Sequence, residues 1–161
     1  WGFEYLNNGL EPYYLDYDEK KLVLFDELND YYDFIKSQTF KKFVDKINHN
    51  KFNFICTSIN ATSAKRNSFL IPHVDTVADD ENNKFTINCI HFIDGNDNDV
   101  EFSGATGIYQ DNEFKEKIFI PNTLKNSLLI YNSKINFFHG FQKMKKNNHR
   151  KAVAFQFFHN D

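Results

Sequence analysis

The sequence predicts a mainly β domain that is preceded by supporting α-helices. From residue 52 onward, β-branched and aromatic residues recur in short runs separated by Asn, Asp, Gly and Lys, which is typical of an all-β unit. Before that point, apolar residues recur at helical spacing instead. The length of 161 residues suits one domain with a substantial core. We therefore expect residues 1–161 to form a single domain, with residues 1–51 as a helical support region and residues 52–158 as the β core.

The composition excludes several classes of protein. Aromatic residues make up 17% of the chain, while Gly and Pro number only 6 and 3, so disordered and linker-rich architectures are excluded. The formal net charge of −3 gives no general attraction to nucleic acids or anionic membranes, and no stretch is long and apolar enough to span a bilayer. Cys56 and Cys89 form no CxxC pair. The sequence thus predicts a soluble, cytoplasmic protein, and because it begins at Trp1 rather than at Met, it leaves open whether residues precede it.

Two packed helices are predicted between residues 27 and 48. The first follows Asp26, a favourable N-cap residue, and ends near Ser37, which can itself cap the second helix. The second helix has apolar residues at positions i, i+3, i+4 and i+7 of a single face. These positions are Phe40, Phe43, Val44 and Ile47.

Eight strands are predicted in the β core. Each is a short apolar run bounded by polar or turn-forming residues. Eight strands over about a hundred residues suit a sandwich, a jelly roll or a barrel. The predicted strands are 52–60, 68–75, 84–93, 106–110, 115–120, 127–131, 135–141 and 150–158.

A candidate metal site begins with the sequence His73-Val74-Asp75 in the second predicted strand. Because alternate residues of a strand share a face, the imidazole and the carboxylate point to the same side. His139 lies in another apolar run, where a polar ring is unusual and needs an explanation. Two histidines and one carboxylate form the facial triad of non-haem Fe(II) sites. The alternative is that His139 is a hydrogen-bonded core residue and that the His-x-Asp spacing is coincidental.

Arg150 is a candidate anion-binding residue. It is one of two arginines beside 17 lysines, and it begins a strongly apolar run. If segments 135–141 and 150–158 form a hairpin, Arg150 is a diagonal neighbour of His139 on one face, within reach of a small dicarboxylate on the metal. A register change of one residue would turn Arg150 to the opposite face. Arginine suits this role because its planar guanidinium binds a carboxylate with two parallel hydrogen bonds.

With these residues in an eight-strand unit, the chain resembles the 2-oxoglutarate and Fe(II)-dependent dioxygenases, and in local sequence their prolyl hydroxylase-like branch. The likeness covers about residues 52–158. Segments 87–94, 103–106 and 150–157 are similar to the strand after the His-x-Asp motif, a Gly-containing turn and the final strand of that branch. The resemblance implies a double-stranded β-helix, which is a jelly-roll or cupin-like fold, with the N-terminal helices packed on one sheet.

The resemblance also implies an oxidoreductase and assigns its catalytic residues. His73, Asp75 and His139 would bind Fe(II), and Arg150 would bind the distal carboxylate of the co-substrate 2-oxoglutarate. The implied reaction uses O₂ to hydroxylate a C–H bond and releases succinate and CO₂, with ascorbate as a further candidate cofactor. A carboxylate at Asp75 favours hydroxylation over halogenation.

The sequence departs from the family pattern beside the co-substrate. Where the prolyl hydroxylase-like branch commonly has a tyrosine, this chain has Phe92. The candidates for a second co-substrate anchor are therefore His91, Asn88 and Thr106.

The sequence leaves the substrate open. By analogy, the first candidate is a peptidyl proline or a similar protein side chain, and a small molecule such as an amino acid or a saccharide is another. The polar segment 76–83 is predicted to form a lid over the substrate. Two alternatives remain, a non-catalytic double-stranded β-helix module that binds a metal or a sugar, and a nucleic-acid dealkylating oxygenase, which the net charge disfavours. Nothing in the sequence determines the oligomeric state.

Overall fold

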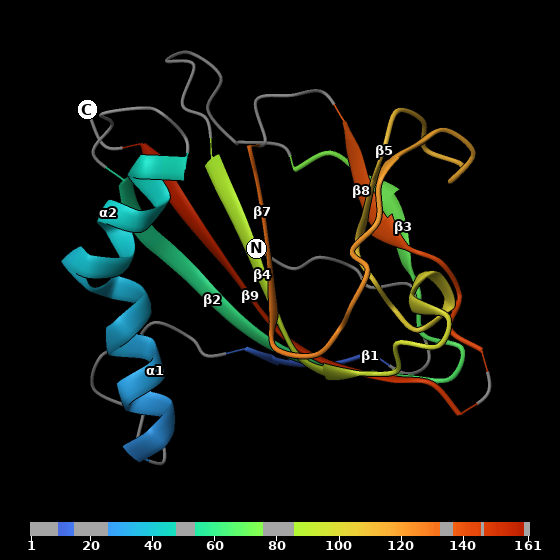
Figure 1. Cartoon of the computed structure of the whole chain (residues 1–161), viewed down its shortest axis with the longest axis horizontal. Helices are drawn as coiled ribbons and strands as arrows, with labels where there is room; N and C mark the ends of the chain where they lie inside the picture. Colours follow the sequence, from blue (N-terminus) through green and yellow to red (C-terminus); the bar gives the residue numbers. More distant parts are fainter. Residues whose placement is uncertain are drawn as a thin grey trace.

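Two antiparallel β-sheets and two helices make up the computed structural model, which describes residues 10–14, 26–47, 54–75, 86–132, 137–145 and 147–159. The helices lie outside the larger sheet, and the smaller sheet lies on its other side (Figure 1). No helix in these ranges is long and apolar enough to cross a membrane. In chain order the elements are β1 (Leu10–Tyr14), α1 (Asp26–Lys36), α2 (Gln38–Ile47), β2 (Phe54–Lys65), β3 (Leu70–His73), β4 (Thr86–Gly95), the 3₁₀ turn η2 (Val100–Phe102), β5 (Gly107–Tyr109), β6 (Lys117–Phe119), β7 (Ser127–Asn132), β8 (Phe138–Phe141) and β9 (His149–His159).

The larger sheet has the strand order β1-β2-β9-β4-β7, and the smaller has the order β3-β8-β5-β6. All neighbouring strands are antiparallel. The chain passes back and forth between the sheets: β3, the pair β5 and β6, and β8 belong to the smaller sheet, and the strands between them belong to the larger one. The predicted mainly β class and the two-sheet arrangement of a double-stranded β-helix are confirmed.

The N-terminal part of the larger sheet differs from the prediction. Residues 10–14, assigned to the helical support region, form β1 and pair with the second half of β2. Strand β2 continues to Lys65, five residues beyond its predicted end at residue 60. Its second half is polar and lacks apolar alternation, so the pairing with β1 and β9 extends the strand there.

The predicted hairpin between segments 135–141 and 150–158 is wrong. Strand β8 pairs with β3 and β5 in the smaller sheet, whereas β9 lies between β2 and β4 in the larger one. The register partners of Arg150 are therefore Ala64 and Gly95, not residues of β8. Both segments are apolar runs that need a strand on each side, and the local pattern does not specify which sheet supplies the partners.

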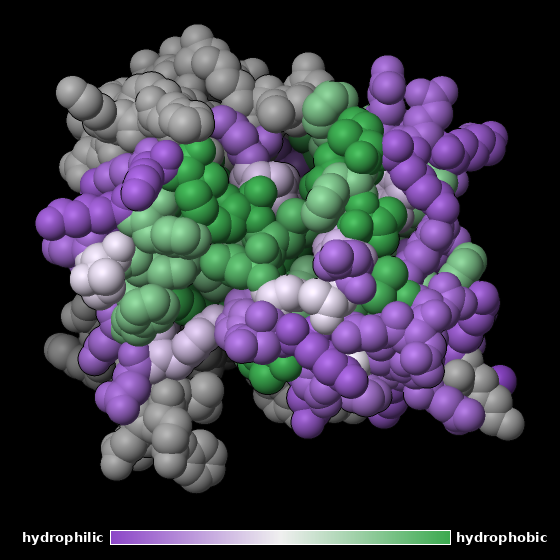
Figure 2. Space-filling model, viewed as in Figure 1, coloured by the Kyte–Doolittle hydropathy of each residue, from purple (hydrophilic) through white to green (hydrophobic). Residues whose placement is uncertain are grey.

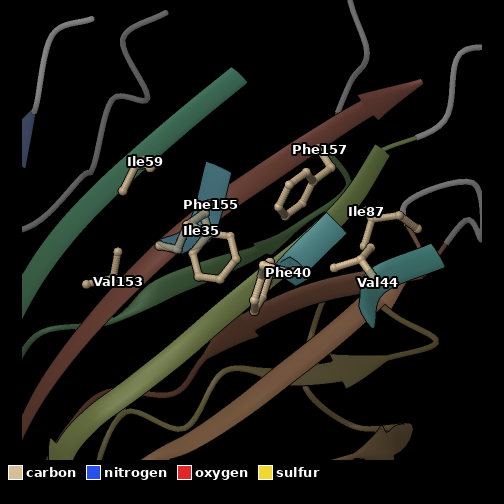
Figure 3. Packing of buried hydrophobic residues seen from close by; sticks show 9 residues of the cluster. Ile35, Phe40, Val44, Ile59, Ile87, Val153, Phe155 and Phe157 are labelled. Atoms are coloured by element: carbon tan, nitrogen blue, oxygen red, sulfur yellow. The ribbon is translucent and has the colours of Figure 1, made fainter. Parts of the chain in front are cut away.

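The helices are fixed to the outer face of the larger sheet by an aromatic cluster. Ser37 caps α2, because the Phe40 backbone N–H donates to its hydroxyl at 3.2 Å, as the sequence predicts. The Phe40 ring packs 5.7 Å from that of Phe155 and 5.9 Å from that of Phe157. Figure 3 shows helix and strand side chains meeting in this cluster. Its buried members are Ile35, Phe40, Val44, Ile59, Ile87, Cys89, Val153, Phe155 and Phe157.

Side-chain alternation along β4 separates this outer cluster from the interior between the sheets. Ile87 and Cys89 belong to the helix-facing cluster, whereas Ile90 and Phe92 belong to a second cluster. Asn88 therefore points to the same inner side as Ile90. The inner face of β4 and β9 is the one that can contribute side chains to a site between the sheets.

Candidate metal centre

Three candidate ligands come together where β3 and β8 meet. His73 ends β3 and is the register partner of His139 in β8, while Asp75 follows His73 by two residues. Asp75 Oδ1 lies 3.5 Å from Nε2 of each histidine. One ligand atom from each of the three residues lies within 4.8 Å of the others. The structure thus brings together the three side chains that the sequence singled out.

Gly140 allows the two strands to approach this closely. A Cβ atom at this position would meet the Leu70 carbonyl oxygen at 2.5 Å and the backbone of Pro72 at 3.1 Å. Neither backbone group can move away without shifting β3. The absence of a side chain at Gly140 therefore sets the spacing between His139 and His73.

Hydrogen bonds orient the ligands. His73 Nδ1 donates to the Ile71 carbonyl at 2.9 Å, which turns Nε2 toward Asp75 Oδ1, 3.5 Å away. Asp75 Oδ2 accepts from Asn88 Nδ2 at 2.5 Å and from Gln156 Nε2 at 3.4 Å. Asn88 and Gln156 are register partners on β4 and β9 of the other sheet. The two amides engage one carboxylate oxygen and leave the other facing the histidines.

The charges in the centre are coupled. Burial opposes the charged form of Asp75, but the hydrogen bond with His73, the charges of His139 and His73 and the Asn88 amide outweigh it and lower the pKa of the carboxyl. Burial lowers the pKa of His139 to about 4, against the attraction of Asp75. Burial also opposes protonation of His73, yet its bonds to Asp75 and the Ile71 carbonyl raise the pKa of its imidazole. The carboxylate form of Asp75 and the uncharged form of His139, which these shifts favour, are the forms that bind a metal ion.

A cavity of about 110 Å³ connects the triad with Arg150. The Arg150 side chain is only 5% exposed, and its guanidinium lies 4.7 Å from the ring centre of Phe141 and 5.3 Å from that of Phe92. The phenylalanine that replaces the family tyrosine thus packs against the arginine. Thr106 lines the same cavity, fully buried, and its hydroxyl has no hydrogen-bond partner among the described residues.

The turn 103–106 holds Arg150 in place. Gly104 has a φ of +93°, and a Cβ atom there would lie 3.1 Å from Arg150 Cδ and 3.1 Å from Met144 Sδ. A residue with a side chain would be strained and would crowd the arginine. The glycine-containing turn, noted in the sequence for its family likeness, therefore packs directly on the arginine.

His91 does not belong to this cavity, so its selection as a co-substrate anchor is wrong. It follows Asn88 by three residues and points to the opposite, helix-facing side of β4. Its Nε2 donates to Asn126 Oδ1 at 3.2 Å, and its Nδ1 accepts from the Tyr31 hydroxyl at 2.8 Å. His91 therefore joins α1 to the sheet.

Sequence reasoning missed Gln156 and Tyr131. Gln156 shares the inner face of β9 with Arg150, because even-numbered residues of that strand point the same way, so alternation from Arg150 was the available signal. Tyr131 lies in β7 beside Asn88, and its ring centre is 5.2 Å from that of His139. Burial, followed by the charge of Asp75, raises the pKa of Tyr131 well above its usual value. No local signal marked this tyrosine, since the pairing of β7 with β4 brings it to the site.

A second cavity, of about 290 Å³, shares Asp75, Tyr131 and His139 with the first. Its remaining lining is apolar except for Asn132. The apolar residues are Val74, Ile108, Ile118, Phe119, Leu129, Ile130 and Phe137. The predicted lid, residues 76–83, lies outside the described residues.

Comparison with known proteins establishes the fold. No protein-family model and no curated protein matches the chain. A 2OG-Fe(II) oxygenase family oxidoreductase from Burkholderia pseudomallei superposes on 86% of the chain with a TM-score of 0.60 and 10% identity. A prolyl hydroxylase from Trichoplax adhaerens, solved with a hypoxia inducible factor peptide fragment, superposes on 94% with a TM-score of 0.60 and 16% identity. The chain spans 59% and 63% of the lengths of these two structures. It therefore has the double-stranded β-helix fold of the 2-oxoglutarate and Fe(II)-dependent oxygenases, in agreement with the resemblance found in the sequence.

Proposed function

We propose that this chain is a 2-oxoglutarate- and Fe(II)-dependent oxygenase that hydroxylates a C–H bond of its substrate and releases succinate and CO₂. The observation that carries the proposal is that the His73-Asp75-His139 triad and the buried Arg150 line one cavity. The triad alone would fit many metal sites. A buried guanidinium beside it adds a site for an anionic group of a metal-bound ligand.

The donor set fits Fe(II). Two imidazole nitrogens and one carboxylate oxygen on one side of a metal form the facial triad that leaves positions for a co-substrate and O₂. His73, Asp75 and His139 would hold the ion, and Asn88 with Gln156 would keep the Asp75 carboxylate aimed at it. We accordingly assign Asn88, first considered as a co-substrate anchor, to positioning Asp75.

Arg150 and Thr106 would bind the distal carboxylate of 2-oxoglutarate. The guanidinium supplies two parallel donors, and the buried Thr106 hydroxyl supplies a third. Phe92 and Phe141 flank the arginine and would shield an ion pair with the co-substrate from water, which would strengthen it. When bound, iron and 2-oxoglutarate supply the oxidation, in which one atom of O₂ enters succinate, the other enters the C–H bond, and CO₂ leaves.

A protein or peptide side chain is the substrate that we favour, with a small molecule as the other candidate. The prolyl hydroxylase with the same fold was solved with a peptide. No lysine or arginine lines the described part of the 290 Å³ cavity, which supports an uncharged reacting group rather than a nucleic acid.

Anaerobic titration with Fe(II) and 2-oxoglutarate tests the proposal. We expect a visible metal-to-ligand charge-transfer band, because the co-substrate chelates the iron, and succinate release when O₂ and a suitable substrate are added. The Asp75→Ala variant should bind iron weakly, whereas Arg150→Ala should keep iron binding but need more 2-oxoglutarate. Arg66→Ala, which removes the other, exposed arginine, is the matched control and should behave as wild type. A module that only binds a metal or a sugar would give no band, and that result would refute the proposal.

A further inference from the structure

The phenol hydroxyl of Tyr131 is a polar group to which the proposed function gives no role. Hydrophobic packing accounts for most of β7. Leu129 and Tyr131 belong to the cluster between the sheets, and Figure 2 shows a mainly apolar surface from α2 across this strand toward the smaller sheet. A phenylalanine ring would fill the same space as the tyrosine ring. Because burying a hydroxyl without a hydrogen-bond partner costs free energy, the presence of a tyrosine here needs an explanation.

The hydroxyl faces the 110 Å³ cavity rather than the 290 Å³ cavity. The Tyr131 ring borders both cavities, and its centre is 5.2 Å from that of His139. The groups that act on the phenol oxygen include the Asn88 amide and the charges of Asp75 and Arg150. Asn88 and Arg150 line the smaller cavity and not the larger one. The polar end of Tyr131 therefore lies toward the space between the triad and the arginine.

This hydroxyl is available as a hydrogen-bond donor. Burial, followed by the charge of Asp75, raises the pKa of Tyr131 well above its usual value and so favours the O–H form. The nearby acceptors do not take its proton. Asp75 Oδ2 accepts from the amides of Asn88 and Gln156 instead, and Asn88 Oδ1 has no hydrogen-bond partner among the described residues. A ligand in the cavity can therefore supply the acceptor.

Hydrogen-bond donors thus lie toward both ends of the 110 Å³ cavity, with Arg150 and Thr106 at one end and Tyr131 beside the triad. A ligand with an anionic group at each end fits this arrangement, and 2-oxoglutarate is such a ligand. We propose that the Tyr131 hydroxyl donates a hydrogen bond to an oxygen of the 2-oxo acid end of 2-oxoglutarate, the end that chelates the metal. This inference rests on the proposed function and adds a co-substrate-binding residue to it.

The anaerobic charge-transfer band of Fe(II) with 2-oxoglutarate tests this inference, because its wavelength depends on the chelating end of the co-substrate. A hydrogen bond to that end lowers the energy of the acceptor orbital, so Tyr131→Phe should move the band to shorter wavelength. The Kd for 2-oxoglutarate should rise about tenfold, as expected for one lost hydrogen bond, while the Kd for Fe(II) alone stays unchanged. Arg150→Ala should raise the Kd for 2-oxoglutarate without moving the band, because the guanidinium would bind the other end.

Tyr109→Phe is the matched control, since it removes a buried hydroxyl outside the site. Tyr109 is fully buried, its hydroxyl has no hydrogen-bond partner among the described residues, and it lines neither cavity. This variant should keep the wild-type wavelength and both wild-type Kd values. A shift of the band in Tyr109→Phe as large as that in Tyr131→Phe would mean that the band responds to packing and would overturn the inference.

Three results with Tyr131→Phe would also overturn it. The first is an unchanged wavelength. The second is an equal loss of affinity for Fe(II) alone, because the phenol would then support the triad rather than the co-substrate. The third is a visible phenolate-to-iron band in the air-oxidised wild type without 2-oxoglutarate that the variant lacks, since Tyr131 would then be a metal ligand. A wild-type band that Tyr131→Phe leaves in place refutes only this inference, whereas a wild type without any band refutes the proposed oxygenase and this inference with it.

Discussion

At the scale of single residues, the Asp75 carboxylate is the most constrained group in the candidate centre. Its Oδ1 faces two imidazoles at 3.5 Å, and its Oδ2 accepts from two amides of the opposite sheet. A carboxylate held at both oxygens loses little freedom when it binds a metal. The amides of Asn88 and Gln156 should therefore contribute to iron affinity without touching the metal.

The first prediction concerns these amides. Asn88→Ala should weaken Fe(II) binding by about tenfold or more, as is usual when a partner of a metal ligand is removed. Gln156→Ala should have a smaller effect, because its amide lies 3.4 Å from the carboxylate rather than 2.5 Å. Anaerobic Fe(II) titration measures both. Equal iron affinity in the wild type and Asn88→Ala would show that the amide does not position Asp75.

The second prediction concerns the buried Thr106 hydroxyl. Thr106→Val keeps the shape of the side chain and removes the donor, so the Kd for 2-oxoglutarate should rise about tenfold while iron binding is unchanged. Titration of the charge-transfer band with 2-oxoglutarate gives this Kd. Thr123→Val is the control, because its hydroxyl binds Asp97 in a loop and does not line the cavity. An unchanged Kd in Thr106→Val would show that Thr106 does not help Arg150 to bind the distal carboxylate.

At the scale of elements, the close approach of β8 to β3 decides whether the centre forms. Strand β3 supplies His73 and is followed by Asp75, and β8 supplies His139. Gly140 sets the spacing between the two strands. The turn 103–106 plays the corresponding part for Arg150. In both places the sequence has glycine where a side chain would displace a functional residue.

The third prediction is that Gly140→Ala weakens iron binding. The added methyl group would overlap the Leu70 carbonyl and force β8 away from β3, at a cost of about 1–3 kcal/mol in the free energy of unfolding. Since His139 would move with β8, the affinity for Fe(II) should also fall. Gly95→Ala meets the Leu124 side chain instead and should lower stability without changing iron affinity. Urea unfolding and Fe(II) titration of both variants provide the comparison, and equal iron affinities would contradict this role of Gly140.

The fourth prediction concerns the attachment of α2 to the sheet. Phe40 is 6% exposed and packs on the rings of Phe155 and Phe157, so Phe40→Ala should lower the free energy of unfolding by about 3–5 kcal/mol. Phe43 is 45% exposed on the same helix, and Phe43→Ala should cost about 1 kcal/mol or less. Chemical denaturation followed by circular dichroism measures both values. Similar losses in the two variants would mean that the outer cluster does not hold the helix.

At the scale of the whole molecule, the two sheets and the helices share their strands and their core. Strand β9 lies between β2 and β4, its outward side chains meet the helices, and its inward ones meet the site. Loss of β9 would therefore disrupt the outer cluster and the metal centre together. We expect the chain to behave as one cooperative domain, as its length predicts.

The fifth prediction follows from this coupling. Fe(II) with 2-oxoglutarate binds only the folded chain in our proposal, so together they should raise the Tm of a single unfolding transition. At concentrations one hundred times Kd, linkage gives about 2.7 kcal/mol of stabilisation per ligand. Chelation of the metal should return the Tm to its starting value, and Asp75→Ala should show no increase. Anaerobic thermal scans measure these shifts, and a rise in the Asp75→Ala variant would place the ligand elsewhere.

Local patterns predicted much of this molecule because they depend on neighbours in the chain. The helix face of α2, its Ser37 cap and the strand that carries His73 follow from spacing within a few residues. Beyond these, the prediction from the sequence missed β1, because that segment has no strong strand pattern and is defined by its pairing with β2. It also placed His91 in the cavity, because residue type alone does not tell which face of β4 is the inner one.

The sequence by itself determined the class of fold and the residues of the candidate centre. Alternation within a strand places His73 and Asp75 on one side, and the rarity of arginine singles out Arg150. Only the tertiary structure decided how these residues meet. Arg150 reaches the triad across the space between two sheets, not across a hairpin, and Asn88, Gln156 and Tyr131 join it through long-range strand pairing. The physical reason is that alternation is a local property of the backbone, whereas the choice of neighbouring strands depends on which apolar faces can be buried together.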